Sequence, residues 1–154
     1  MVSKFQNGMQ GVFLTAAELT HRGFVVSLTS RNAFGADLLV TDNQCQRTWS
    51  VQVKTNKSTS ANFWLVNAHS KKIKCDSHIY VFVGLKGNQR PYFLVVPSSI
   101  VAANVDEQKT KNGTWYSFSR NTKGMPKDEG WKAAFGNPGS SLGQETDPIT
   151  ESSN

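Results

Sequence analysis

Three residues carry side chains that together suit cation binding and proton transfer: a carboxylate at Asp37, an amide at Gln52 and an amine at Lys54. Carboxylate and amide oxygens bind hard divalent cations, and an amine beside such a cation orients or deprotonates water. The three residues are separated in the sequence, so they act together only if the local fold brings them to one place.

A β-hairpin would bring these side chains together. Residues 37–41 and 48–54 are rich in apolar and β-branched side chains, as strands are, and a polar cluster typical of a turn separates them.

The register of this hairpin follows from its turn. If Asp42 faces Arg47 across the loop, Asp37 faces Gln52, because the residue numbers of opposed pairs have a constant sum in an antiparallel ladder. Opposed residues point to the same face of the sheet. Lys54 lies two positions beyond Gln52 and shares that face. The sequence therefore predicts one cluster of Asp37, Gln52 and Lys54.

The remaining elements predict an α/β fold. Apolar spacing, turn residues and β-rich runs predict a helix over 8–22, strands over 24–29, 63–66, 77–85, 90–96 and 114–119, and helices over 97–109 and 125–135. The connection 67–76 is expected to be exposed. The run over 77–85 is apolar almost throughout, as in a strand buried on both faces. This order of elements predicts an α-β-α sandwich with a mixed central sheet flanked by helices.

Charge is distributed unevenly along the 154 residues, whose net charge is +6. Residues 137–154 contain three acids and no Lys or Arg, and their composition predicts a disordered acidic tail after a single domain over 1–136. Residues 43–75 contain six cations and no acid. Such a basic stretch indicates either a polyanionic partner or a solvated lysine-rich face.

Several classes of protein are not supported by the sequence. It has no apolar run long enough to span a membrane, no signal-peptide pattern, and neither phosphate-binding glycine motif. Cys45 and Cys75 have no zinc-site spacing, and a reduced, cytoplasmic protein is the simplest expectation, with a single disulfide as the alternative.

The segment G-A-D-L-L-V, followed after ten residues by V-Q-V-K-T, resembles the core motif of the PD-(D/E)xK nuclease superfamily. The upstream segment G-V-F-L-T-A-A-E-L-T-H-R-G-F-V-V is similar to the first helix and strand of that superfamily, so the resemblance covers residues 8–55. It implies a restriction-endonuclease-like fold, Mg²⁺ or Mn²⁺ as the cofactor, DNA as the partner, and a homodimer.

The resemblance also implies roles for individual residues in phosphodiester hydrolysis by a DNA endonuclease. Asp37 would be a carboxylate ligand of the metal ion, Gln52 a variant ligand and the peptide oxygen of Val53 a third. Lys54 would position the attacking water and stabilise charge on the phosphate.

Two departures from the superfamily pattern leave other functions open. Gln52 stands in place of the second acid, and Val12 stands where many relatives have a glutamate after the helix glycine; Glu18 lies on another part of the helix. One alternative is a catalytically degenerate module that binds nucleic acid or a protein without cleavage, and a weaker one is an assembly module. For Asp37 and Lys54 alone, the alternative is a simple ion pair.

Further residues are candidates for contact with nucleic acid. The cations predicted to follow its backbone are Lys57, Lys71, Lys72, Lys74 and Arg31. Trp64 is interpreted either as a stacking platform or, preferably, as a core aromatic. Thr55 is either a phosphate contact or, preferably, a threonine at the end of a strand.

Overall fold

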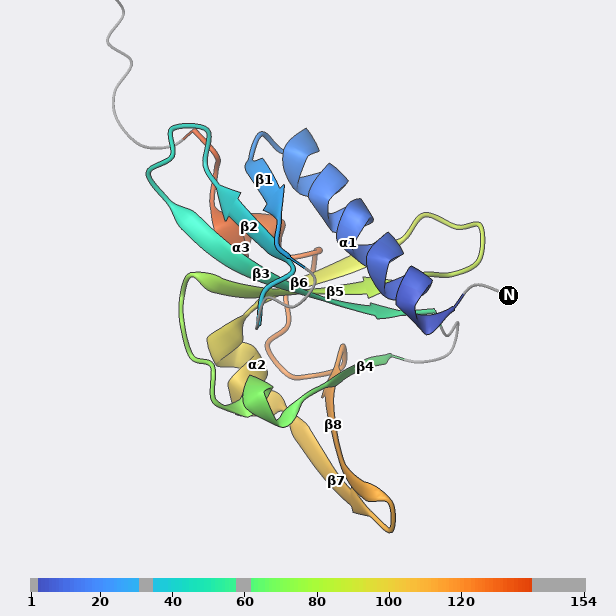
Figure 1. Cartoon of the computed structure of the whole chain (residues 1–154). Helices are drawn as coiled ribbons and strands as arrows, with labels where there is room; N and C mark the ends of the chain where they lie inside the picture. Colours follow the sequence, from blue (N-terminus) through green and yellow to red (C-terminus); the bar gives the residue numbers. More distant parts are fainter. Residues whose placement is uncertain (1–2, 31–34, 58–61, 140–154) are drawn as a thin grey trace, which may run out of the picture.

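The protein is described by a computed structural model over residues 3–30, 35–57 and 62–139. Its elements are α1 (Lys4–His21), β1 (Val25–Leu28), β2 (Leu38–Thr41), β3 (Thr48–Asn56), β4 (Phe63–Val66), the 3-10 helix η1 (Ala68–Lys71), β5 (His78–Gly84), β6 (Tyr92–Pro97), α2 (Ser98–Asn104), β7 (Asp106–Thr110), β8 (Gly113–Ser119) and α3 (Trp131–Phe135). In Figure 1, α1 crosses one face of the main sheet, while α2 and the β7–β8 hairpin lie beyond the other. No helix in these three ranges is long and apolar enough to cross a membrane.

The main sheet has five strands in the order β1-β2-β3-β5-β6. Strands β3 and β5 are parallel and the other neighbours antiparallel, so the sheet is mixed, as predicted. Every residue of β5 is buried, which confirms the prediction for this apolar run. A second sheet, β4-β8-β7, was not anticipated as a separate layer.

The predicted register of the hairpin is confirmed. Its ladder runs from Leu38 opposite Val51 to Thr41 opposite Thr48. The N–H of Asp42 donates to the carbonyl oxygen of Arg47 at 3.1 Å and closes the loop.

Two apolar cores cover the two faces of the main sheet. Under α1 lie mainly aliphatic side chains and the edge-to-face or tilted rings of Phe24, Trp49 and Phe135. On the opposite face a second core joins β5 and β6 to α2 and the second sheet; its buried members are Trp64, Tyr80, Phe82, Leu94, Val96, Val101 and Phe118. Strand β5 is buried on both faces, whereas β3 contributes buried side chains only to the core under α1.

Helix α1 begins one turn earlier than predicted from Gly8. Ser3 caps its N-terminus: the Ser3 hydroxyl accepts from the Gln6 N–H at 3.2 Å, and the Gln6 side chain accepts from the Ser3 N–H at 2.7 Å. This capping box satisfies backbone donors that the first turn leaves unpaired.

Two predicted helices are shorter in the structure. The helix predicted over 97–109 ends at Asn104, and residues 106–110 form β7 instead. All five residues of β7 are exposed and polar, so a continued helix would have had no apolar face to bury, whereas pairing with β8 satisfies the backbone. The helix predicted over 125–135 begins only at Trp131, because Gly130 has a left-handed φ of 88°.

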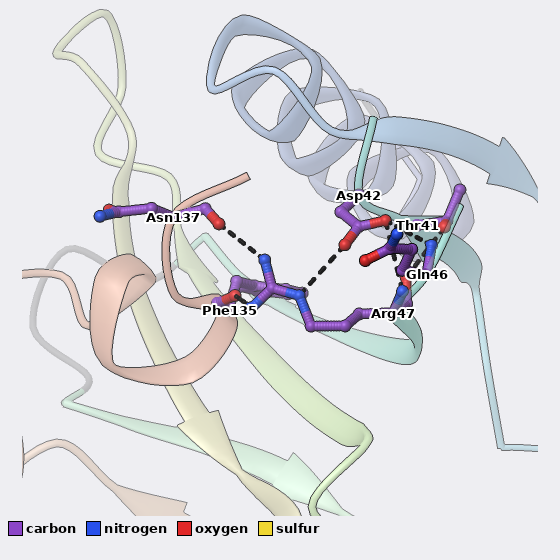
Figure 2. A network of polar contacts seen from close by, with 6 residues as sticks. All are labelled: Thr41, Asp42, Gln46, Arg47, Phe135 and Asn137. Atoms are coloured by element: carbon purple, nitrogen blue, oxygen red, sulfur yellow. Dashed lines mark hydrogen bonds and ion pairs between the residues drawn. The ribbon is translucent and has the colours of Figure 1, made fainter. Parts of the chain in front are cut away.

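Arg47 ties the hairpin turn to the chain beyond α3 (Figure 2). Its guanidinium donates to the Asp42 carboxylate at 3.1 Å and to the carbonyl oxygen of Asn137 at 2.6 Å. Burial raises the pKa of Asp42, but hydrogen bonds from the Gln46 N–H and from Arg47 outweigh it and leave that pKa below 3.8. Arg47 therefore has a structural role.

Two predictions from composition have different outcomes. Cys45 and Cys75 are both free and exposed, so the disulfide alternative is wrong. The predicted boundary after residue 136 stays a prediction, because residues 140–154 of the predicted tail lie outside the described part of the chain.

Gly11 permits the close packing of α1 on β3. A Cβ atom there would overlap the Thr55 side chain, whereas a Cβ at Gly8 would meet nothing within 4 Å. We expect Gly11→Ala to lower the free energy of unfolding by about 1–2 kcal/mol, since overpacking outweighs the gain in helix propensity. Gly8→Ala, the matched control, should raise it by about 0.5–1 kcal/mol. Urea unfolding measures both; equal stabilisation by the two substitutions would show that α1 does not need this contact.

Candidate active site

Asp37 lies where β2 separates from β3. The ladder between these strands ends at Leu38 and Val51, while β3 continues beside β5 as far as Asn56. The edge of β3 beyond Val51 therefore needs another hydrogen-bonding partner.

The Asp37 carboxylate is that partner. Its Oδ2 atom accepts from the Val53 N–H at 2.7 Å and from the Gln52 side-chain amide at 2.7 Å. The Asp37 backbone is also held, because its N–H donates to the Val51 carbonyl oxygen at 2.8 Å and its carbonyl oxygen accepts from the Thr29 N–H at 3.1 Å. The predicted proximity of Asp37 and Gln52 is thus present in the structure.

Lys54 is positioned by the alternation of side chains along β3. Gln52 and Lys54 are in register with Tyr80 and Phe82 of β5, which belong to the second core, whereas Val53 points into the core under α1. Burial lowers the pKa of Lys54 below its ordinary value of 10.5, and the charge of Asp37 partly opposes that shift. The alternative of a simple ion pair is wrong, because none of the ion pairs in the described ranges joins Asp37 to Lys54.

Two hollows meet beside these side chains. One, of about 380 Å³, contains Asp37 and is lined largely by the N-terminal half of α1 and the end of β1. The other, of about 950 Å³, contains Lys54 and lies between α1, the end of β3 and β4. Lys4, Gly8 and Val53 line both hollows, so the hollows adjoin. We call the first the apolar pocket and the second the basic groove.

The basic groove is lined by Lys4, Lys54 and Lys57, with no acidic residue among its described lining. Sequence reasoning found Lys54 and Lys57 but missed Lys4, because it began the helix at Gly8. The capping pattern Ser3-x-x-Gln6 is the signal that would have found Lys4. Lys4 stands in a first turn without acidic residues, where the helix dipole adds to its positive charge.

The other predicted cations do not gather at this site. Lys71 forms an ion pair with Glu107 of β7 at 2.7 Å, which raises the pKa of Lys71. Lys72 and Lys74 are exposed in the connection after η1 and line neither hollow. Arg31 lies outside the described residues.

Two further predictions concern aromatic stacking and phosphate contact. Trp64 is buried and its indole N–H donates to the Val83 carbonyl oxygen at 2.9 Å, which confirms the core interpretation. The Thr55 hydroxyl is buried against Gly11 of α1, so the interpretation as a strand-end residue holds.

The oxygen atoms around Asp37 bear on whether the site can hold a divalent cation. No cluster of three His, Cys, Asp or Glu residues occurs in the described part of the chain. Asp37 supplies one carboxylate, and a half-turn of the Gln52 amide would present an oxygen where its nitrogen now lies, 2.7 Å from Asp37 Oδ2. The Val53 carbonyl points to the same side of β3 as its N–H. These oxygens fit a hard cation that keeps several waters.

No acid from α1 strengthens this set. Val12 is buried and lines the apolar pocket. Glu18 is bound to Arg22 at 2.7 Å in the last turns of the helix. The described part of the chain therefore has no acid near Asp37 in place of Val12 or Gln52, because Glu18 is paired with Arg22.

No family model and no curated protein matches the sequence. A bacterial homing endonuclease is similar in structure, with a TM-score of 0.53, 18% identity, and 86% of this chain and 91% of that chain covered. A Holliday junction resolvase from Archaeoglobus fulgidus has a TM-score of 0.46, 11% identity, and covers 73% of this chain and 84% of its own.

The first likeness spans most of both chains. The chain has the restriction-endonuclease-like fold. The fold that the sequence resemblance implied is therefore confirmed. Within the restriction-endonuclease-like fold, the segment that carries the resemblance forms α1, β1, β2 and most of β3.

The environment of Lys54 makes a titration prediction. We expect Lys54 to titrate below 10.5, and to titrate lower still in Asp37→Asn, because that substitution removes the charge that favours the ammonium form. Lys71 is the internal control: it should titrate above 10.5, and Glu107→Gln should lower its pKa without moving that of Lys54. NMR titration of the lysine side-chain resonances measures these pKa values. A Lys54 pKa that does not respond to Asp37→Asn would refute the coupling.

Proposed function

We propose that the protein is a divalent-metal-dependent DNA endonuclease that hydrolyses phosphodiester bonds at Asp37. The observation that carries this proposal is the Asp37 carboxylate, held by Gln52 and Val53 at the open edge of β3 and electrostatically coupled to a partly buried Lys54. The restriction-endonuclease-like fold supports it, and the basic groove beside the cluster suits a polyanion.

In this proposal Asp37, Gln52 and the Val53 carbonyl would hold Mg²⁺ or Mn²⁺. Such an ion neutralises charge on a phosphate and makes a bound water acidic. Asp37 is fixed in position by two hydrogen bonds, and the Gln52 amide would turn over to offer its oxygen to the ion. Lys54, whose pKa is lowered by burial, loses its proton more readily than an ordinary lysine and suits orientation or deprotonation of the attacking water. Lys4 and Lys57 would bind flanking phosphates.

The second candidate is a module that binds DNA without cutting it. The specific observation in its favour is that the Gln52 amide donates to Asp37, so that part of the site is satisfied without a cation. Val12, which stands where a helix acid would bind the metal ion, also favours this candidate. Such a module would keep the basic groove and a salt-dependent affinity for DNA. Cleavage of both strands would need two copies of the chain, and a homodimer stays a prediction.

Purified protein should nick plasmid or branched DNA in Mg²⁺ or Mn²⁺. We expect Asp37→Ala and Lys54→Ala each to reduce the rate at least about 100-fold, since each removes a group that acts on the reacting atoms. Lys74→Ala, an exposed lysine outside both hollows, is the matched control and should keep the rate. Cleavage that survives both active-site substitutions would assign the activity elsewhere. Binding without cleavage would favour the second candidate, and no binding to nucleic acid at low salt would leave the assembly module.

Gln52→Glu tests whether the single carboxylate limits metal binding. The substitution would place a second acid beside Asp37, and affinity for a hard cation rises with the charge of its ligands. We expect the Mg²⁺ concentration for half-maximal cleavage to fall by about tenfold or more. Gln46→Glu, in the hairpin turn, is the control for the added charge. An unchanged metal requirement would exclude Gln52 from the ligand set.

A further inference from the structure

The apolar pocket beside Asp37 has a lining that phosphate binding does not explain. Phe5, Met9 and Val12 of α1 and Leu28 of β1 form its apolar walls, and its volume is about 380 Å³. Phe5 is 52% exposed and Leu28 is 49% exposed, so two of these walls present apolar surface to solvent. Exposed apolar surface gathered in a concave site of this size is typical of ligand binding.

The pocket adjoins the basic groove. Lys4 and Gly8 border both hollows, and space beside Gly8 is open. A polyanion that follows Lys57, Lys54 and Lys4 along the groove therefore arrives beside Asp37 and at the mouth of the apolar pocket. The chemistry required of an occupant is thus an anionic backbone with an apolar, flat group next to it. A nucleotide strand has both, since each phosphate is followed by a base with a stacking face.

We propose that the apolar pocket accepts one unpaired nucleobase next to the phosphate at Asp37. The inference rests on the proposed function and narrows its substrate to DNA with an unpaired nucleotide at the cleavage position. A base within an intact duplex is stacked on both sides and cannot enter a pocket until it leaves the stack. The Phe5 ring supplies the stacking partner, and Val12 adds apolar surface to the pocket wall.

A second copy of the chain is a competing occupant of the apolar walls. Phe13 provides the comparison, because it lies two turns beyond Phe5 on α1, is 55% exposed and does not line the pocket. A dimer contact spread over the helix would use both rings, whereas a base in the pocket would contact Phe5 alone. The acid-free basic groove next to Phe5 favours the nucleotide.

The experiment compares binding of a fully paired DNA duplex with binding of the same duplex carrying a central single-stranded gap, without metal and at low salt. We expect wild-type protein to bind the gapped DNA about tenfold more tightly, as one base–aromatic stack allows. Phe5→Ala should abolish this preference and keep the affinity for the paired duplex. Phe13→Ala should keep the preference. Because both phenylalanines are exposed, both variants should fold, which circular dichroism checks.

The other possible outcomes of this experiment each support or overturn the base pocket. Equal affinity for the two DNAs, or equal loss of preference in both variants, overturns the base pocket. Self-association that Phe5→Ala abolishes, with the preference unchanged, assigns the pocket to a second copy and also overturns it. The cleavage assay separates this result from the proposed function: equal cleavage of both DNAs overturns the base pocket and supports the endonuclease. A retained Phe5-dependent preference without cleavage supports the pocket and overturns the endonuclease.

Discussion

Asp37 accepts hydrogen bonds from Val53 and Gln52 at the point where the β2–β3 ladder ends. These bonds join the chain before β2 to the continuing edge of β3. An N–H group at a strand edge must find an acceptor, and the carboxylate supplies one that also carries charge. The same oxygen therefore ends the β2–β3 ladder, orients the Gln52 side chain and provides the negative charge that acts on Lys54. The Asp37 carboxylate thus serves both the backbone structure at this edge and the candidate metal site.

Hydrogen-bond donors and a cation would compete for the lone pairs of the Asp37 carboxylate. Satisfying Asp37 with N–H donors stabilises the folded chain, but it occupies lone pairs that a cation would use. An amide at Gln52 can meet both demands, because one rotation exchanges its donor for its acceptor. A carboxylate at that position would bind a cation better and would repel Asp37 whenever the cation is absent. Gln52 is therefore compatible with a site that is stable in both states.

The sequence was sufficient for the hairpin and for the central strands. A constant sum along an antiparallel ladder needs only one correct pair, and Asp42 opposite Arg47 was correct. The sequence was not sufficient for elements whose conformation depends on tertiary contacts. A polar run such as 106–110 has no periodicity that distinguishes a helix from an exposed strand, so β7 was missed. The apolar spacing predicts a helix from Gly8, so Lys4 falls outside the predicted helix although it belongs to α1. The two hollows depend on how closely α1 packs on β3, which no local pattern encodes.

Strand β7 borders the second sheet, and its outer side has no neighbouring strand in the described part of the chain. A strand in that position offers its backbone groups to any other extended chain, which is a common route to aggregation. Asp106, Glu107 and Lys109 place alternating charges along it, and no apolar side chain occurs in it. The polar composition that hides β7 from sequence-based prediction thus protects the protein against edge pairing with other chains.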